Sequence, residues 1–168
     1  MAQSNLFDAF KYFKKLGDSN RLAQEEGFST GFCSGIGSLQ DYMQHFRTKD
    51  RYILIDDTTT ESTYSNGVGF FRKDVYTIFI VAGYVIDDMQ DREAKLNLCR
   101  RIFRQIHSRL VHDVAEGTEG DALEYLAVDR IYSNELSGTF MNGVTGLYFM
   151  VENDEPIDLT YNANEWID

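Results

Sequence analysis

The sequence predicts an α+β fold, in which a mainly antiparallel sheet of about four to five strands packs against a long helix, with additional N-terminal helices. Short segments rich in Val, Ile, Tyr and Phe alternate with stretches whose apolar residues recur at helical spacing. The chain has 168 residues, of which 43% are hydrophobic and one is proline. These values are typical of one compact domain and exclude a disordered chain.

Charge and cysteine content exclude several classes of protein. Sixteen basic against 27 acidic residues give a net charge of −11, which argues against a nucleic-acid reader with a basic footprint. Cys33 and Cys99 alone do not make a disulfide framework. No apolar run approaches the ~18 residues of a membrane span, and the N-terminus lacks signal-peptide features. We therefore expect an acidic, soluble protein that folds in a reducing compartment.

We predict a single α+β domain over residues 1–151, followed by an acidic C-terminal arm at 152–168. Its helical part covers residues 1–47 and contains an amphipathic helix at 5–16, stopped by Gly17–Asn20. The glycine-bearing stretch Gly27–Gly37 is expected to be a loop, and Ser38 to cap a second helix at 39–46.

The sheet and the long helix are predicted over residues 48–151. A first strand at 51–56 is followed by a polar loop and then by a hairpin of strands 68–71 and 75–86 that turns near Arg72–Asp74. Residues 75–82 are apolar at nearly every position, which predicts a strand covered on both faces by helices or by another subunit.

The helix that follows is the longest predicted element. Asp87 or Asp88 can cap it, and it should end before Glu116–Gly120. Its apolar stripe comprises Leu96, Cys99, Ile102, Phe103, Ile106 and Leu110. Two further strands are predicted at 125–132 and 146–151, and the strand pattern ends at Glu152.

The sequence contains one motif that could belong to an enzyme. Gly31-Phe32-Cys33-Ser34-Gly35 matches a nucleophile elbow with cysteine as the nucleophile, so a small cysteine hydrolase or peptidase with His107 or His112 as base is one alternative function. However, Glu26–Thr30 is a poor strand, and the two histidines lie five residues apart on different helix faces. Adjacent Asp56 and Asp57 would point to opposite faces of a strand. We predict no enzyme, no cofactor and no metal site; a cytoplasmic binding adaptor is a further alternative.

The predicted C-terminal arm combines acidic and apolar residues. It has six carboxylates and no Lys or Arg, and it contains the only Trp of the chain. Disordered segments are typically poor in aromatic residues, so we expect the arm to dock, either on a neighbouring subunit or back on its own. The predicted subunit interface joins basic residues of the long helix to apolar residues of the arm: Arg100, Arg101, Arg104, Tyr161, Trp166 and Ile167.

The polar loop between the first predicted strands is a second candidate contact. It is rich in Thr and Ser, and we expect it either to project from the body and contact a partner or to be a plain solvent loop. The residues proposed for this assembly loop are Thr59, Thr60, Glu61, Ser62, Thr63 and Tyr64.

The order of elements resembles the bacteriophage tail-terminator (tail-completion, head–tail joining) family. The resemblance covers residues 45–152 and depends on three stretches: the buried strand and helix over Val75–Leu110, the predicted strand Tyr125–Ile131, and the closing strand Gly146–Val151. It implies a structural virion protein without cofactor or catalysis, forming a homohexameric ring at the tail end or neck.

The resemblance also implies partners and a location. The tail tube protein and neck or head–tail connector proteins would be the partners, and the protein would lie in the virion, having assembled in the host cytoplasm. If DNA passes through such a ring, the net charge of −11 predicts passage without specific binding, because phosphate binding relies on Lys and Arg.

Overall fold

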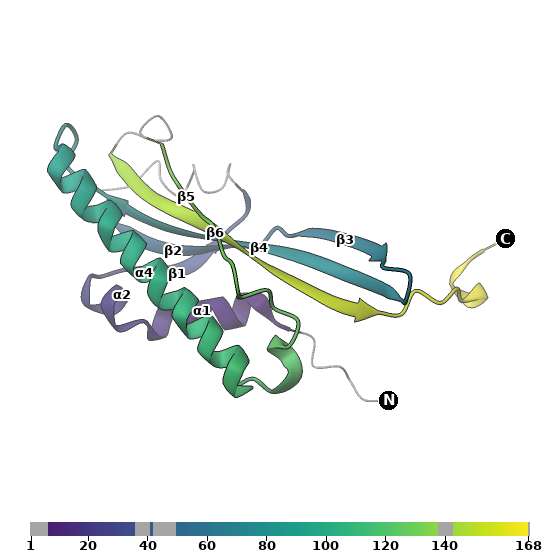
Figure 1. The fold of residues 1–168 in the computed structure, drawn as a ribbon. Coiled ribbons are helices and arrows are strands. Elements are labelled where there is room, and N and C mark those ends of the chain that lie inside the picture. Colours follow the sequence, from purple (N-terminus) through teal and green to yellow (C-terminus); the bar gives the residue numbers. More distant parts are fainter. Residues whose placement is uncertain (1–6, 36–40, 42–49, 138–142, 168) are drawn as a thin grey trace.

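The fold is α+β, with a six-stranded, mostly antiparallel sheet and a long helix across one face (Figure 1). The computed structural model describes residues 7–35, 41, 50–137 and 143–167. The strand order is β1-β2-β4-β6-β5, and β3 pairs with β4 beside this path. The fold class is therefore confirmed, with slightly more strands than predicted. The helix predicted at 39–46 lies, apart from Asp41, outside the described residues.

The N-terminal helices begin at short polar side chains. In α1 (Ala9–Ser19), Asp8 accepts a hydrogen bond from the Lys11 N–H at 3.1 Å, and in α2 (Arg21–Glu25), Asn20 accepts one from the Ala23 N–H at 2.8 Å. Such caps satisfy N–H groups that have no partner within the helix. The first predicted helix is thus confirmed, but it begins at Ala9 rather than at residue 5 and runs past Gly17 to Ser19.

The centre of the sheet is the pairing of β4 (Phe70–Gly83) with β6 (Val144–Ile157). The two strands are antiparallel over 14 residue pairs, from Phe70 opposite Ile157 to Gly83 opposite Val144. The other edge of β4 pairs with β3 (Thr60–Ser65) over Phe70–Val75 and with β2 (Arg51–Asp56) over Ile78–Ala82. Strand β1 (Ser29–Cys33) runs parallel to β2, and β5 (Ser133–Glu135) pairs with β6.

Several strand predictions were wrong. No turn lies at Arg72–Asp74, and the strand pattern does not end at Glu152, because β4 and β6 continue through these polar residues as one pair. The polar loop predicted between the first two strands contains β3, and the predicted loop at 27–37 contains β1. The stretch 125–132 forms a single bridge between Leu126 and Asn153 rather than a strand.

The long helix α4 (Met89–Glu116) confirms the prediction, although it includes Glu116, one residue beyond the predicted end. Asp88 caps its N-terminus, and Gly117 ends it in a left-handed conformation with φ of 59°. Helices α1 and α4 cover one face of the sheet, where Ile78, Ile80 and Phe149 contribute to the main core. A second buried cluster lies on the other face: Cys33, Leu54, Phe79, Val81, Leu136 and Val144. The central part of β4 is therefore buried on both faces, as predicted.

Beyond the helices, the sheet continues as a narrow projection (Figure 1). We call this projection the β-arm: it consists of β3, Phe70–Val75 of β4 and Glu152–Ile157 of β6. The arm explains the mispredicted strands: every β3 side chain is exposed, and polar side chains of β4 and β6, such as Arg72 and Glu155, pair with one another across the strands, so polar residues occupy both faces. The alternation used to recognise half-buried strands is absent there.

Gly146 marks a position where the central pair tolerates no side chain. It adopts a φ of 149°, which favours glycine, and a Cβ there would overlap the Ile80 carbonyl oxygen and lie 2.8 Å from the Val81 Cα. We expect Gly146→Ala to lower the free energy of unfolding by about 2–4 kcal/mol, measured by urea denaturation. Gly69→Ala, where an added Cβ meets nothing within 4 Å, is the control. An unchanged Gly146→Ala midpoint would contradict the close approach.

Candidate assembly site

Polar contacts between strands hold the β-arm together on both of its faces. On one face, Arg72 pairs with Asp74 at 3.1 Å and with Glu155 on the opposite strand. On the other face, Lys73 pairs with Glu152 at 2.6 Å.

Tyr64 adds an aromatic contact on the same face as Lys73. Its ring stacks on that of Phe71 with centroids 5.8 Å apart, and its hydroxyl donates to Asp154 at 2.7 Å. The predicted assembly loop, Thr59–Tyr64, is therefore largely a strand in a projecting ribbon, and its contact with a partner stays a prediction.

Apolar side chains gather at the far end of the arm. Val68, in the turn between β3 and β4, is 95% exposed, and Phe70, the first residue of β4, is 48% exposed. The C-terminal segment, residues 158–168, follows β6; its described part, residues 158–167, continues from the end of β6 next to this turn, beyond the tip of the arm (Figure 1). Monomeric proteins rarely leave such a concentration of large apolar side chains in water.

The C-terminal segment does not fold back on its own chain. Its described residues are all exposed, with Trp166 at 64% and Ile167 fully exposed. Tyr161 and Trp166 stack on each other with ring centroids 6.3 Å apart. Of the two dockings expected for this segment, docking within its own chain is absent from the described residues, and docking on a neighbouring subunit stays a prediction.

The structure separates the three predicted helix arginines into two groups. Arg101 and Arg104 are exposed on the outer face of α4, where they line a shallow hollow of about 340 Å³ with Gln105 and Ser108. Neither forms an ion pair within the described part of the chain. Arg100 instead donates to Glu135 of β5 at 2.6 Å and to Glu93 at 2.9 Å, so it is engaged within its own chain.

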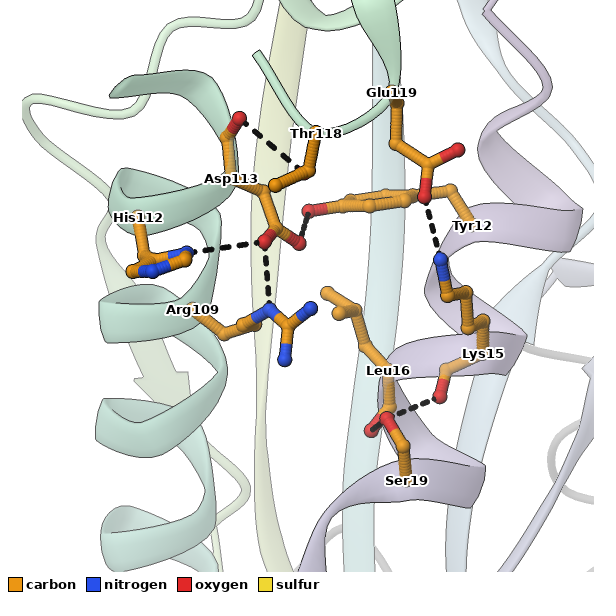
Figure 2. A network of polar contacts seen from close by, with 9 residues as sticks. All are labelled: Tyr12, Lys15, Leu16, Ser19, Arg109, His112, Asp113, Thr118 and Glu119. Carbon is orange, nitrogen blue, oxygen red and sulfur yellow. Dashed lines mark hydrogen bonds and ion pairs between the residues drawn. The ribbon is translucent and has the colours of Figure 1, made fainter. Parts of the chain in front are cut away.

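A buried carboxylate joins α1 to the end of α4 (Figure 2). Asp113, 2% exposed, accepts hydrogen bonds from the Tyr12 hydroxyl at 2.9 Å and the Arg109 Nε at 2.7 Å. His112 Nδ1 lies 3.3 Å from the same carboxylate. Beside it, Lys15 pairs with Glu119 at 2.5 Å. Burial favours a raised pKa for Asp113, but the donors outweigh it and hold its pKa below the ordinary value.

The residues of the cysteine-hydrolase alternative do not come together. Cys33 belongs to the buried cluster on the sheet face opposite α4, so the sheet separates it from His107 and His112. Burial, with a smaller contribution from Asp56 and Asp57, raises the pKa of the Cys33 thiol to about 12. His107 Nε2 lies 2.7 Å from the carbonyl oxygen of Val128. A thiol with such a raised pKa is a poor nucleophile.

Three further findings concern metal binding, membrane spans and similarity to known proteins. The described residues contain no group of three or more His, Cys, Asp or Glu that could hold a metal ion. None of their helices is both long and apolar enough to span a bilayer. No protein-family model matches the chain, and no curated protein matches it.

Sequence reasoning missed the ion pairs of the β-arm. Arg72 and Lys73 were assigned to a turn, and Glu152, Asp154 and Glu155 to a tail. The signal in the sequence was charge: the basic pair Arg72-Lys73 directly follows one predicted strand, and the acidic stretch Glu152–Glu155 directly follows another. An antiparallel pairing brings such segments side by side.

The network around Asp113 predicts a loss of stability in acid. Because the folded-state pKa of Asp113 lies below its unfolded value of about 3.9, its stabilisation is present above that pH and disappears as the pH falls through the folded pKa. We expect Asp113→Asn to lower the free energy of unfolding by about 1–3 kcal/mol at pH 7, and by progressively less below pH 4.

The control is Asp18→Asn, which removes an exposed i,i+4 pair with Lys14 and should cost only about 0–0.5 kcal/mol. Urea denaturation at several pH values measures both variants. Equal losses for Asp113→Asn at pH 7 and pH 3 would show that the carboxylate charge is not what stabilises this contact.

Proposed function

We propose that this chain is a structural virion protein of a tailed bacteriophage, which forms a ring at the tail end or neck, terminates the tail tube and joins it to the head. The observation that carries the proposal is the exposed apolar C-terminal segment at the end of a projecting β-arm. Trp166, whose one ring contact in the described residues is with Tyr161 of the same segment, and Ile167 are both largely exposed. Such groups are typical of a subunit that is completed by its neighbours.

The placement of the candidate surfaces supports a ring. The C-terminal segment lies beyond the tip of the arm, whereas Arg101 and Arg104 lie on α4 over the body of the sheet (Figure 1). A contact between two different surfaces of identical subunits is head-to-tail, and it closes into a ring when the rotation per subunit divides a full turn. A homohexamer is the ring that the family resemblance implies.

Electrostatics supports the same arrangement. The C-terminal segment carries Asp158, Glu165 and Asp168 without a basic residue, while Arg101 and Arg104 face solvent without an ion pair in the described residues. Opposite charges would steer the segment toward a neighbouring helix and set its orientation, and the apolar side chains would provide most of the affinity. In a ring of this acidic chain, DNA would pass without specific binding.

Two observations test the proposed function. Negative-stain images of the purified protein should show rings with a central opening. In the virus that encodes the chain, deleting its gene should leave filled heads separate from tails of uncontrolled length. Normal particles in the absence of the chain would overturn the proposal.

The anchoring residues of the C-terminal segment provide a sharper prediction. We expect Trp166→Ala to weaken self-association about tenfold or more, because a buried aromatic anchor contributes on the order of 2 kcal/mol. Its neighbour Glu165→Ala should change the dissociation constant less than about threefold, since exposed charges contribute little. Sedimentation velocity over a concentration series measures both, and equal effects would assign the affinity to charge instead.

A further inference from the structure

The outer edge of β3 is open. Its inner edge pairs with β4, all six of its residues are exposed, and no other strand of the described chain pairs with it. Figure 1 shows β3 at the margin of the β-arm. Natural edge strands are commonly protected by prolines, lysines or bulges. Strand β3, with the sequence TESTYS, contains a single charge and no proline.

The turn at the tip shows which backbone groups of β3 face outward. The N–H of Asn66 donates to the carbonyl of Gly69 at 3.2 Å, so these two residues form a hydrogen-bonded pair. Hydrogen-bonded and non-hydrogen-bonded pairs alternate in an antiparallel ladder. By the register of β3 with β4, Glu61, Thr63 and Ser65 are therefore the residues whose N–H and C=O groups point away from β4.

The start of the C-terminal segment has the pattern of a strand. Over Asp158–Asn162, Leu159 and Tyr161 alternate with three polar residues, and both apolar side chains are exposed. In an antiparallel register that places Leu159 opposite Tyr64, Thr160 faces Thr63 and Asn162 faces Glu61. No two like charges meet in this register, and Leu159 and Tyr161 lie on the face that carries the stacked rings of Tyr64 and Phe71.

Residues Asp158–Asn162 cannot pair with this edge in their own chain. It leaves β6, which is separated from the outer edge of β3 by β4 and β3 themselves. Three strand spacings of about 4.8 Å amount to about 14 Å, which takes about four extended residues. Residues 158–161 would be used up in the crossing, so the strand that binds must come from another copy.

We infer that residues Asp158–Asn162 of one copy add as a strand to the outer edge of β3 in a second copy. This inference deepens the proposed function, on whose self-assembly it rests: it names the acceptor surface and its occupant. Main-chain hydrogen bonds would supply the pairing, and the face carrying Tyr64 would select Leu159 and Tyr161. Trp166 and Ile167 would then lie farther along the neighbouring subunit.

Proline substitution on either strand tests the inference. Thr63→Pro removes an outward N–H of β3 without removing a hydrogen bond to β4, and edge strands tolerate proline. Thr160→Pro removes the facing N–H from the exposed segment, where it cannot unfold the body. We expect each to weaken self-association at least about tenfold in sedimentation velocity, whereas the matched controls Thr63→Val and Thr160→Val should retain it.

Mixing two defective chains provides the decisive measurement. The Thr63→Pro chain keeps its C-terminal segment, and a chain truncated after Ile157 keeps its open edge. Neither should form rings alone, but together they should form a one-to-one heterodimer, because the defects lie on opposite sides of one interface. Thermal melting shows whether each variant folds; if Thr63→Pro does not, the Thr160→Val and Thr160→Pro pair decides.

Each other outcome overturns the inference. Rings formed normally by both proline variants would show that Asp158–Asn162 does not pair with the outer edge of β3. Assembly that is lost in Thr63→Pro but retained after truncation would mean that two β3 edges pair with each other. A wild-type chain that stays monomeric at sub-millimolar concentration would exclude strand addition between copies. The gene deletion described above tests the proposed function separately, because it measures whether heads and tails join and not which strand pairs with β3.

Discussion

The 14-residue antiparallel pairing of β4 with β6 is the contact on which the rest of the molecule depends. Its inner half lies in the core beneath α1 and α4, and its outer half is the β-arm. Because the side-chain period of a strand is two, a shift of one residue would turn the core face of β6 toward the opposite side and separate Arg72 from Glu155. The apolar core and the charges of the arm therefore specify the same register from both ends.

The two halves of this pair differ in what stabilises them. In the body, buried residues such as Ile80 and Leu147 are fully removed from water, and each contributes about 1.5–3 kcal/mol. In the arm, half-exposed ion pairs such as Lys73–Glu152 contribute only about 0–1 kcal/mol. The charges of the arm thus agree with the register that the body sets, and they stabilise it less than the buried residues do. Elements of this kind gain the most from a partner.

The sequence predicts this structure well where burial is periodic and poorly where it is absent. Helix α4 was predicted to within one residue at both ends because Asp88 can cap a helix and the stretch Glu116–Gly120 contains two glycines. The exposure of Arg101 and Arg104 followed from helical spacing, whereas the pairing of Arg100 with Glu135 joins residues 35 positions apart and has no local signal. Strand β3 was missed because all of its side chains are exposed, so neither face shows an apolar pattern.

An unpaired strand edge must be short if it is to bind one partner strand rather than many. Here β1 occupies the edge of β2 next to it, and the turn after Ser65 closes the other end, so the free edge is six residues long. That length suits a short segment such as Asp158–Asn162 and is too short to template an extended sheet. Each copy carries one such edge and one such segment on opposite sides of the β-arm. In an open filament, one terminal subunit keeps an unpaired β3 edge and the other keeps an unpaired segment. In a closed ring every edge and every segment is paired, which favours a ring over an open filament.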